Sequence, residues 1–191
     1  MRNVHMILVL ATSLLPFATV QAAPADLPET GQTLCYDATG AAIACAGTRQ
    51  DGDLKAGLAW PSPRFTVGTG ATAACVTDNL TGLMWVASPS TISATWTDAL
   101  TSANGLTLCG FSDWRLPNVN ELESPVNSEA ANPAILLNAQ GFTGVQARYY
   151  WSSSSYAGSP AFAWIVSMFD GNVSANEKSN SNYVWPVRAG Q

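Results

Sequence analysis

Apolar and polar residues alternate along much of the C-terminal half of the chain, the pattern of β-strands whose side chains point alternately to two faces. We predict strands over residues 148–153 and 161–169, a return strand beginning at 172–174, and a closing strand over 183–188. Asp170 and Gly171 separate the second and third of these strands, and an Asp-Gly pair predicts a tight hairpin turn with positive φ.

The predicted strand 161–169 has two different faces. One face is large and apolar, which predicts core, and it comprises Phe162, Trp164, Val166 and Met168. The other face is mixed and is a candidate lining for a solvent-facing site, with Ala163, Ile165, Ser167 and Phe169.

Helical periodicity appears in the middle of the chain. Trp96, Ala99, Leu100 and Ala103 recur on one helical face, Ser93 or Thr95 is placed to cap that helix, and Gly105 ends it. Asn118 and Glu121 form the spacing of a capping box for a second helix, which Pro125 cuts short. A further helical turn is expected over 135–138. Helices followed by antiparallel strands predict an α+β fold.

The N-terminus has the pattern of an export signal. Arg2 precedes an apolar run over 6–15, Pro16 breaks it, and small residues stand before a cleavage point that we place after Ala22. The run is shorter than a membrane-spanning helix requires, and no later segment is apolar enough to span. We therefore expect a signal peptide over 1–22 and an exported chain, periplasmic, on the outer surface or secreted, with no transmembrane segment after cleavage.

Charge and histidine content narrow the possible functions. Removing residues 1–22 takes away Arg2 and the only histidine, His5, leaving seven Lys and Arg against thirteen Asp and Glu. An acidic chain disfavours nucleic acid, since that binding rests on cations that neutralise phosphates. Without histidine, Ser-His-Asp and Cys-His catalysis are excluded. Carboxylate pairs remain, but Glu121 and Glu123 should diverge on a helix. We expect no enzyme activity, no catalytic residues, no cofactor and no metal.

Four cysteines follow the predicted cleavage point: Cys35, Cys45, Cys75 and Cys109. An even count in an exported protein favours disulfides. Three pairings are possible, and we prefer Cys35–Cys45, which would staple a hairpin turning near Gly40, with Cys75–Cys109. A zinc site is disfavoured because the chain lacks a C-x-x-C motif. Residues 23–64 are predicted to be an N-terminal extension ending in a Pro-rich linker, and 65–191 the main domain.

Several motifs in the main domain carry a family resemblance: D-x-x-T-G-L-x-W from Asp78, G-x-x-D-W-R-L-P-N-x-x-E-L from Gly110, Y-W-S-S from Tyr150, A-W-x-V from Ala163, and P-V-R from Pro186. In this order and spacing the chain resembles the Lcl-type C-terminal domain family, a bacterial family of largely unassigned function. The resemblance implies a C-type-lectin-like fold with two helices on a twisted antiparallel sheet. It also implies a binding role, since the family is named for a collagen-like adhesin whose end domain is linked to sulfated glycosaminoglycans.

The motifs and the two faces of the predicted strands divide the candidate residues into a structural set and a contact set. The structural set, expected to hold loops to the sheet or fill the core, is Asp113, Trp114, Arg115, Glu121, Trp151, Trp164 and Arg188. The contact set, rich in exposed aromatic, Ser and Asn residues, is Ser153, Ser155, Tyr156, Ile165, Ser167, Phe169, Asn176, Lys178, Asn180, Asn182 and Trp185.

These sets predict a non-enzymatic module that recognises a glycan or a protein at the bacterial cell surface or envelope, as an adhesin does. Three alternative functions stay open. The first is a structural subunit of an envelope assembly, and the second is a hypervariable binding protein diversified by a retroelement. The least favoured is a carboxylate hydrolase.

Overall fold

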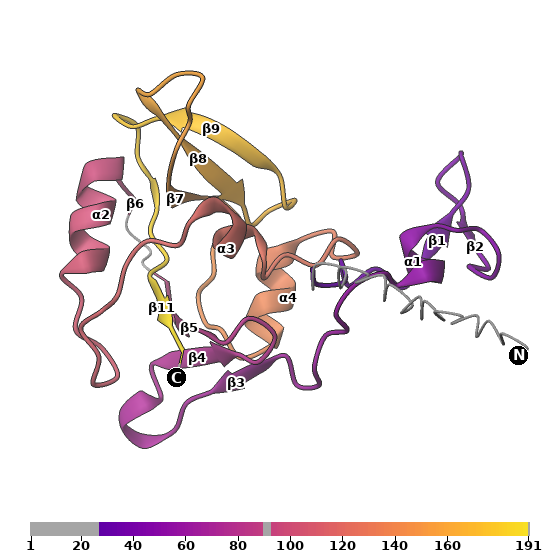
Figure 1. Cartoon of the computed structure of the whole chain (residues 1–191), viewed down its shortest axis with the longest axis horizontal. Coiled ribbons are helices and arrows are strands. Elements are labelled where there is room, and N and C mark those ends of the chain that lie inside the picture. The colour runs from indigo at the N-terminus through magenta and orange to yellow at the C-terminus, as the bar shows by residue number, and fades with distance from the viewer. Residues whose placement is uncertain (1–26, 90–92, 191) are drawn as a thin grey trace, which may run out of the picture.

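The computed structural model describes residues 27–89 and 93–190 (Figure 1). The expected signal peptide over 1–22 lies outside these residues. The described chain is a mixed α+β structure with two main sheets, a small hairpin, few helices and two disulfides. The predicted α+β class is confirmed.

The N-terminal extension forms a small unit set apart from the sheets in Figure 1. Strands β1 (Cys35–Tyr36) and β2 (Ala42–Ile43) pair as a hairpin, and helix α1 (Asp51–Leu54) lies beside them. The expected Cys35–Cys45 disulfide joins the two arms. At the turn, the Asp37 carboxylate accepts hydrogen bonds from Thr39 and from the Ala41 amide, and these bonds lower its pKa. The extension meets the main domain where Glu129 accepts hydrogen bonds from the backbone and hydroxyl of Thr33.

The first main sheet has four antiparallel strands in the order β11-β5-β4-β3. Its strands are β3 (Phe65–Val67), β4 (Cys75–Asp78), β5 (Leu83–Val86) and β11 (Val187–Ala189). A short 3-10 helix (Gly70–Thr72) joins β3 to β4. A tight turn joins β4 to β5, with Gly82 at φ +71° donating its N–H to the Asp78 carbonyl. The expected Cys75–Cys109 disulfide fastens β4 to the loop after the first main-domain helix.

The second main sheet has five strands in the order β6-β10-β7-β8-β9. Its strands are β6 (Ser93–Ala94), β7 (Tyr149–Ser155), β8 (Phe162–Ser167), β9 (Val173–Glu177) and β10 (Asn182–Tyr183). Strand β10 runs parallel to β7, and the other pairs are antiparallel. The prediction of one continuous closing strand over 183–188 is wrong, because the chain leaves this sheet after Tyr183 and joins the other at Val187.

The turn between β8 and β9 also differs from the prediction. Ser167 donates its N–H to the Asn172 carbonyl, so four residues, Met168 to Gly171, form the loop instead of two. Gly171 has φ +79°, as a turn glycine should, but Asp170 keeps negative φ. The two-residue turn is therefore replaced by a longer loop, which Met168 anchors in the core.

The helices begin and end where the capping residues predict. Helix α2 (Trp96–Asn104) is capped by Thr95 and followed by Gly105, and α3 (Val119–Glu123) begins with the Asn118–Glu121 capping box. Helix α4 (Pro133–Ala139) is longer than the single turn expected, with Asn132 as its N-cap. In the described part of the main domain, three α-helices rather than two thus accompany the main sheets.

Strand β8 is buried on both faces, which the sequence pattern did not predict. Val166 and Met168 pack in the larger core between the sheets, while Ala163 and Ile165 pack against Ala99 and other residues of the α2 face. Ser167 is buried as well. The expectation that Ile165 and Ser167 face solvent is therefore wrong: α2 covers the face on which Ile165 lies, and the core and the turn enclose Ser167.

An aromatic cluster forms the centre of the larger core. The Trp185 ring lies 5.1 Å from the rings of Trp85 and Phe142 and 5.6 Å from that of Tyr150. Its Nε1–H donates to the Val86 carbonyl at 2.9 Å. Burial raises the pKa of Tyr150 to about 12. The expectation that Trp185 is an exposed contact residue is therefore wrong, since it is fully buried.

Candidate functional site

The charged residues of the D-W-R-L-P-N motif hold the motif loop to strand β11 and to helix α3. Asp113 accepts two hydrogen bonds from Arg188, at 2.7 and 3.1 Å, and the guanidinium lies 3.7 Å from the Phe111 ring centroid. Arg188 is buried, whereas Asp113 is exposed. The hydrogen bonds from Arg188 lower the pKa of Asp113. This geometry holds a loop against strand β11.

Arg115 and Glu121 form the second pair of the motif. Two parallel hydrogen bonds of 2.7 Å join the guanidinium to the carboxylate, which also accepts the Asn118 backbone N–H. Burial by itself would raise the pKa of Glu121, but the bonds from Arg115 and Asn118 outweigh it and lower that pKa. The same bonds raise the pKa of Arg115. The pair fastens the start of α3 to the motif loop.

This pair predicts a small pH dependence of stability. Because the pKa of Glu121 is lower in the folded chain, its contribution is present above the unfolded pKa of about 4.3 and is lost as pH falls through the folded value. Glu121→Gln should reduce the free energy of unfolding by about 1 kcal/mol at neutral pH. Urea unfolding of both proteins across acid pH measures this, and the difference should shrink as pH falls. A difference independent of pH would contradict the assignment.

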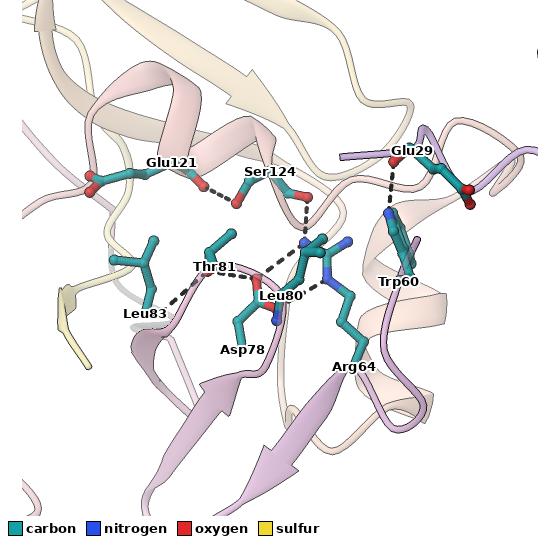
Figure 2. A network of polar contacts seen from close by, with 9 residues as sticks. All are labelled: Glu29, Trp60, Arg64, Asp78, Leu80, Thr81, Leu83, Glu121 and Ser124. Carbon is teal, nitrogen blue, oxygen red and sulfur yellow. Dashed lines mark hydrogen bonds and ion pairs between the residues drawn. The ribbon is translucent and has the colours of Figure 1, made fainter. Parts of the chain in front are cut away.

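A buried network links the extension, the linker and the main domain (Figure 2). Arg64 donates to both oxygens of Asp78, at 3.2 and 3.1 Å, and to the Ser124 carbonyl at 2.6 Å. The Trp60 ring covers the guanidinium at 4.0 Å, and its Nε1–H donates to the Glu29 carbonyl. Both charged side chains are almost fully buried. The network therefore holds the linker against the main domain.

Aromatic and polar residues that are fully or partly exposed gather at one end of the second sheet. We call this region the sheet-end surface. It lies where β7 connects to β8 and where β9 ends, at the top of Figure 1. Its residues are Ser155, Tyr156, Trp164, Asn176, Lys178 and Asn180.

Lys178 is fixed in place on this surface. Its ammonium donates to the Ser155 hydroxyl at 2.8 Å and to the Pro160 carbonyl at 2.9 Å. The same ammonium lies 4.1 Å from the centroid of the Trp96 ring. Trp96 is itself held by a hydrogen bond from its Nε1–H to the Ser152 carbonyl. The cation therefore has a defined position relative to the neighbouring hydroxyl.

Tyr156 is the exposed ring of the surface, with 37% of its area accessible. It packs edge-on against Trp164, with ring centroids 5.1 Å apart. A Cβ at Gly158 would lie 2.7 Å from the tyrosine ring, so the ring is seated against the loop backbone. On the adjacent strand end, Asn180 donates to the Asn176 side chain at 2.8 Å. The surface thus combines a supported aromatic ring with amide groups at fixed positions.

The structure separates the predicted contact residues into three groups. Five of them lie on the sheet-end surface: Ser155, Tyr156, Asn176, Lys178 and Asn180. Phe169 is exposed at the opposite end of β8. The others are partly or fully buried: Ser153, whose N–H donates to the Pro117 carbonyl, together with Ile165, Ser167, Asn182 and Trp185. The expectation that Asn182 is exposed is wrong because it lies in β10, between β6 and β7.

The predicted structural residues are mostly buried or paired. Trp114 and Trp151 are buried, and their indole N–H groups donate to the Leu108 and Ala94 carbonyls. Trp164 differs from the expected core residue because it is only partly buried and supports Tyr156.

Sequence reasoning missed Trp96 and Gly158 as residues that support the sheet-end surface. Trp96 was assigned to the core face of its helix, and its contact with Lys178 has no local signal in the sequence. Gly158 had a weak signal, as a glycine in a loop that directly follows an aromatic residue.

Two further findings concern the described residues alone. Within 27–89 and 93–190, no group of three or more His, Cys, Asp or Glu side chains is placed to hold a metal ion. Across the same ranges, no helix has the length and apolar character needed to cross a membrane.

Comparison with known proteins gives one finding on identity. No curated protein matches the chain. The sequence model of the Lcl C-terminal domain matches residues 74–188, which include both ion pairs of the D-W-R-L-P-N motif and the sheet-end surface. Because the match covers more than half of the sequence, the chain belongs to the Lcl C-terminal domain family.

Proposed function

We propose that this chain is an exported, non-enzymatic binding module that recognises a glycan or a protein at the bacterial cell surface or envelope through the sheet-end surface. The observation that carries the proposal is the exposed Tyr156 ring, supported by Trp164, at the same end of the sheet as the ordered side chains of Lys178 and Asn180. In this proposal the main domain, 65–191, is C-type-lectin-like, the extension is 23–64, and a signal peptide over 1–22 directs export.

The order of these side chains favours binding. Immobilising a flexible side chain on association costs about 0.5–1.5 kcal/mol. Lys178 and Tyr156 are already held by contacts within the chain, so much of that cost is met before a partner arrives. Aromatic residues with adaptable polar neighbours are also the groups that dominate many recognition surfaces.

The state of the carboxylates supports a non-enzymatic role. A general acid at neutral pH needs a raised pKa, as in the carboxylate pairs of glycosidases. Asp113 and Glu121 instead have lowered pKa values and are paired with arginines. Asp78 is fully buried in its ion pair with Arg64. These acidic groups serve the fold rather than a reaction.

The proposal predicts that a partner is lost when the sheet-end surface is altered. The chain without residues 1–22 is screened on a glycan array and by affinity capture from envelope extracts, beside a Tyr156→Ala, Lys178→Ala double variant. We expect the double variant to weaken binding of the identified partner at least about tenfold. Tyr36→Ala is the matched control because Tyr36 is exposed to a similar extent, 40%, on the extension.

Two outcomes would contradict the proposal. One is a partner that the double variant binds as tightly as the control does. The other is turnover of a screened substrate that is lost in a carboxylate variant such as Glu121→Gln.

A further inference from the structure

A hollow lies at the end of the second sheet opposite to the sheet-end surface, where β7 begins and β8 ends. It has a volume of about 250 Å³ and is lined by Ala147, Arg148, Tyr149, Ser167, Phe169 and Asp170. We call it the β8-turn groove. It shares no residue with the sheet-end surface, so its function is independent of the one proposed above.

Two aromatic side chains in this groove are unusually exposed. Phe169 has 57% of its area accessible and Tyr149 has 41%. Single exposed apolar residues are normal on protein surfaces, but here two exposed rings line the same hollow. Two such rings are suited to a ligand with an apolar face.

The backbone that carries these rings is firmly held. Buried Met168 donates its N–H to the Arg148 carbonyl at 2.9 Å, and its own carbonyl accepts the Ala134 N–H at 2.9 Å. Tyr149 is paired with Ser167 in the sheet register. Phe169 is thus displayed from a turn fixed to both the sheet and α4, and the groove needs little rearrangement to receive a ligand.

The polar groups of the groove carry both signs of charge. Asp170 is exposed, and hydrogen bonds from the Ser167 hydroxyl and the Asn172 backbone lower its pKa, so it is a carboxylate at neutral pH. Arg148, also exposed, supplies a guanidinium. The groove therefore offers charged donors and acceptors together, so the attraction of an anion to Arg148 is offset by its repulsion from Asp170.

The groove's size limits its occupant. Pockets for drug-sized ligands span about 300–1,000 Å³, and this groove is smaller. One ring of a larger molecule fits a groove of this size better than a whole drug-sized ligand does. The ring must have an apolar face for Tyr149 and Phe169 and hydroxyl groups that both donate and accept at its edge, for Arg148 and Asp170.

We propose that the β8-turn groove binds one neutral pyranose ring, as a terminal sugar of a glycan, between Tyr149 and Phe169, with Arg148 and Asp170 hydrogen-bonding its hydroxyls.

The test is an NMR titration of the ¹⁵N-labelled chain without residues 1–22. The probes are the methyl glycosides of glucose, galactose, mannose and N-acetylglucosamine, with methyl glucuronide as the anionic probe. At least one neutral glycoside should cause saturable shifts of the amides over 147–149 and 167–170. Phe169→Ala should weaken that binding about tenfold, whereas Tyr36→Ala should leave it unchanged, and both variants should keep the dispersed spectrum of a folded protein.

Any of three results would overturn the proposal. The first is that none of the neutral glycosides shifts these amides. The second is that Phe169→Ala binds the glycoside as tightly as the control does. The third is that the glucuronide binds more tightly than every neutral probe. Shifts confined to the sheet-end surface would count against the groove while leaving the function proposed for that surface intact.

Discussion

Replacing Asp78 with asparagine is expected to lower the free energy of unfolding by about 3–5 kcal/mol, the usual cost of removing one partner from a buried ion pair. Asp78 is fully buried and accepts two hydrogen bonds from Arg64, one from the Leu80 backbone and one from the Thr81 hydroxyl. An amide has no charge to balance the guanidinium, so Arg64 would remain buried without a counter-ion.

Chemical denaturation of the purified chain, monitored by tryptophan fluorescence, measures this loss. Glu123→Gln is the matched control, because it makes the same carboxylate-to-amide change at an exposed position of α3. The control should change stability by no more than about 0.5 kcal/mol. An Asp78→Asn variant as stable as the control would show that the Arg64–Asp78 pair does not hold the linker to the domain.

Trp185→Ala is expected to cost about 3–5 kcal/mol, the typical range for removing a buried tryptophan. The substitution would leave a void among Trp85, Phe142 and Tyr150 and would remove the donor to the Val86 carbonyl. The surrounding strands come from both main sheets, so the void cannot close without moving one sheet against the other.

The same truncation at Trp164 provides the contrast. Trp164 is only partly buried, so Trp164→Ala should cost about 1–2 kcal/mol. Thermal unfolding of the two variants side by side gives the ranking. If the Trp185 variant proved the more stable of the two, the placement of Trp185 in the core would be contradicted, and its original assignment to a contact surface would regain support.

Local signals in the sequence predicted the local structure well. Thr95, Gly105 and the Asn118–Glu121 box set the ends of α2 and α3 because capping depends on a few adjacent side chains. The preferred Cys35–Cys45 disulfide is present for a similar reason, since the short hairpin brings the two Cα atoms to 5.1 Å from each other.

Long-range packing could not be read from the pattern of single strands. The mixed face of β8 looked solvent-exposed, but Ile165 is buried in a cluster that includes Ala99 and Ala103 of α2. The position of a tryptophan in a strand-like run does not by itself show whether its ring is buried. Trp185 turns into the core because its segment crosses from one sheet to the other, while Trp164 stays near the surface. Both outcomes depend on which element lies opposite.

The candidate site was predicted in part. Tyr156, Lys178 and the nearby Ser and Asn residues were identified by composition, and the structure brings them together at one sheet end. Their support by Trp96 and Trp164 was not foreseen, since the contact between Lys178 and Trp96 joins segments far apart in the sequence.

The central claim, that the sheet-end surface is the recognition surface, is tested most directly by hydrogen–deuterium exchange of the chain with and without its captured partner. The account predicts slower exchange in the β7–β8 connection, 155–162, and at the end of β9, 176–181, with the extension over 33–58 unchanged. Protection confined to the extension or to α4, with no change at the sheet end, would contradict it.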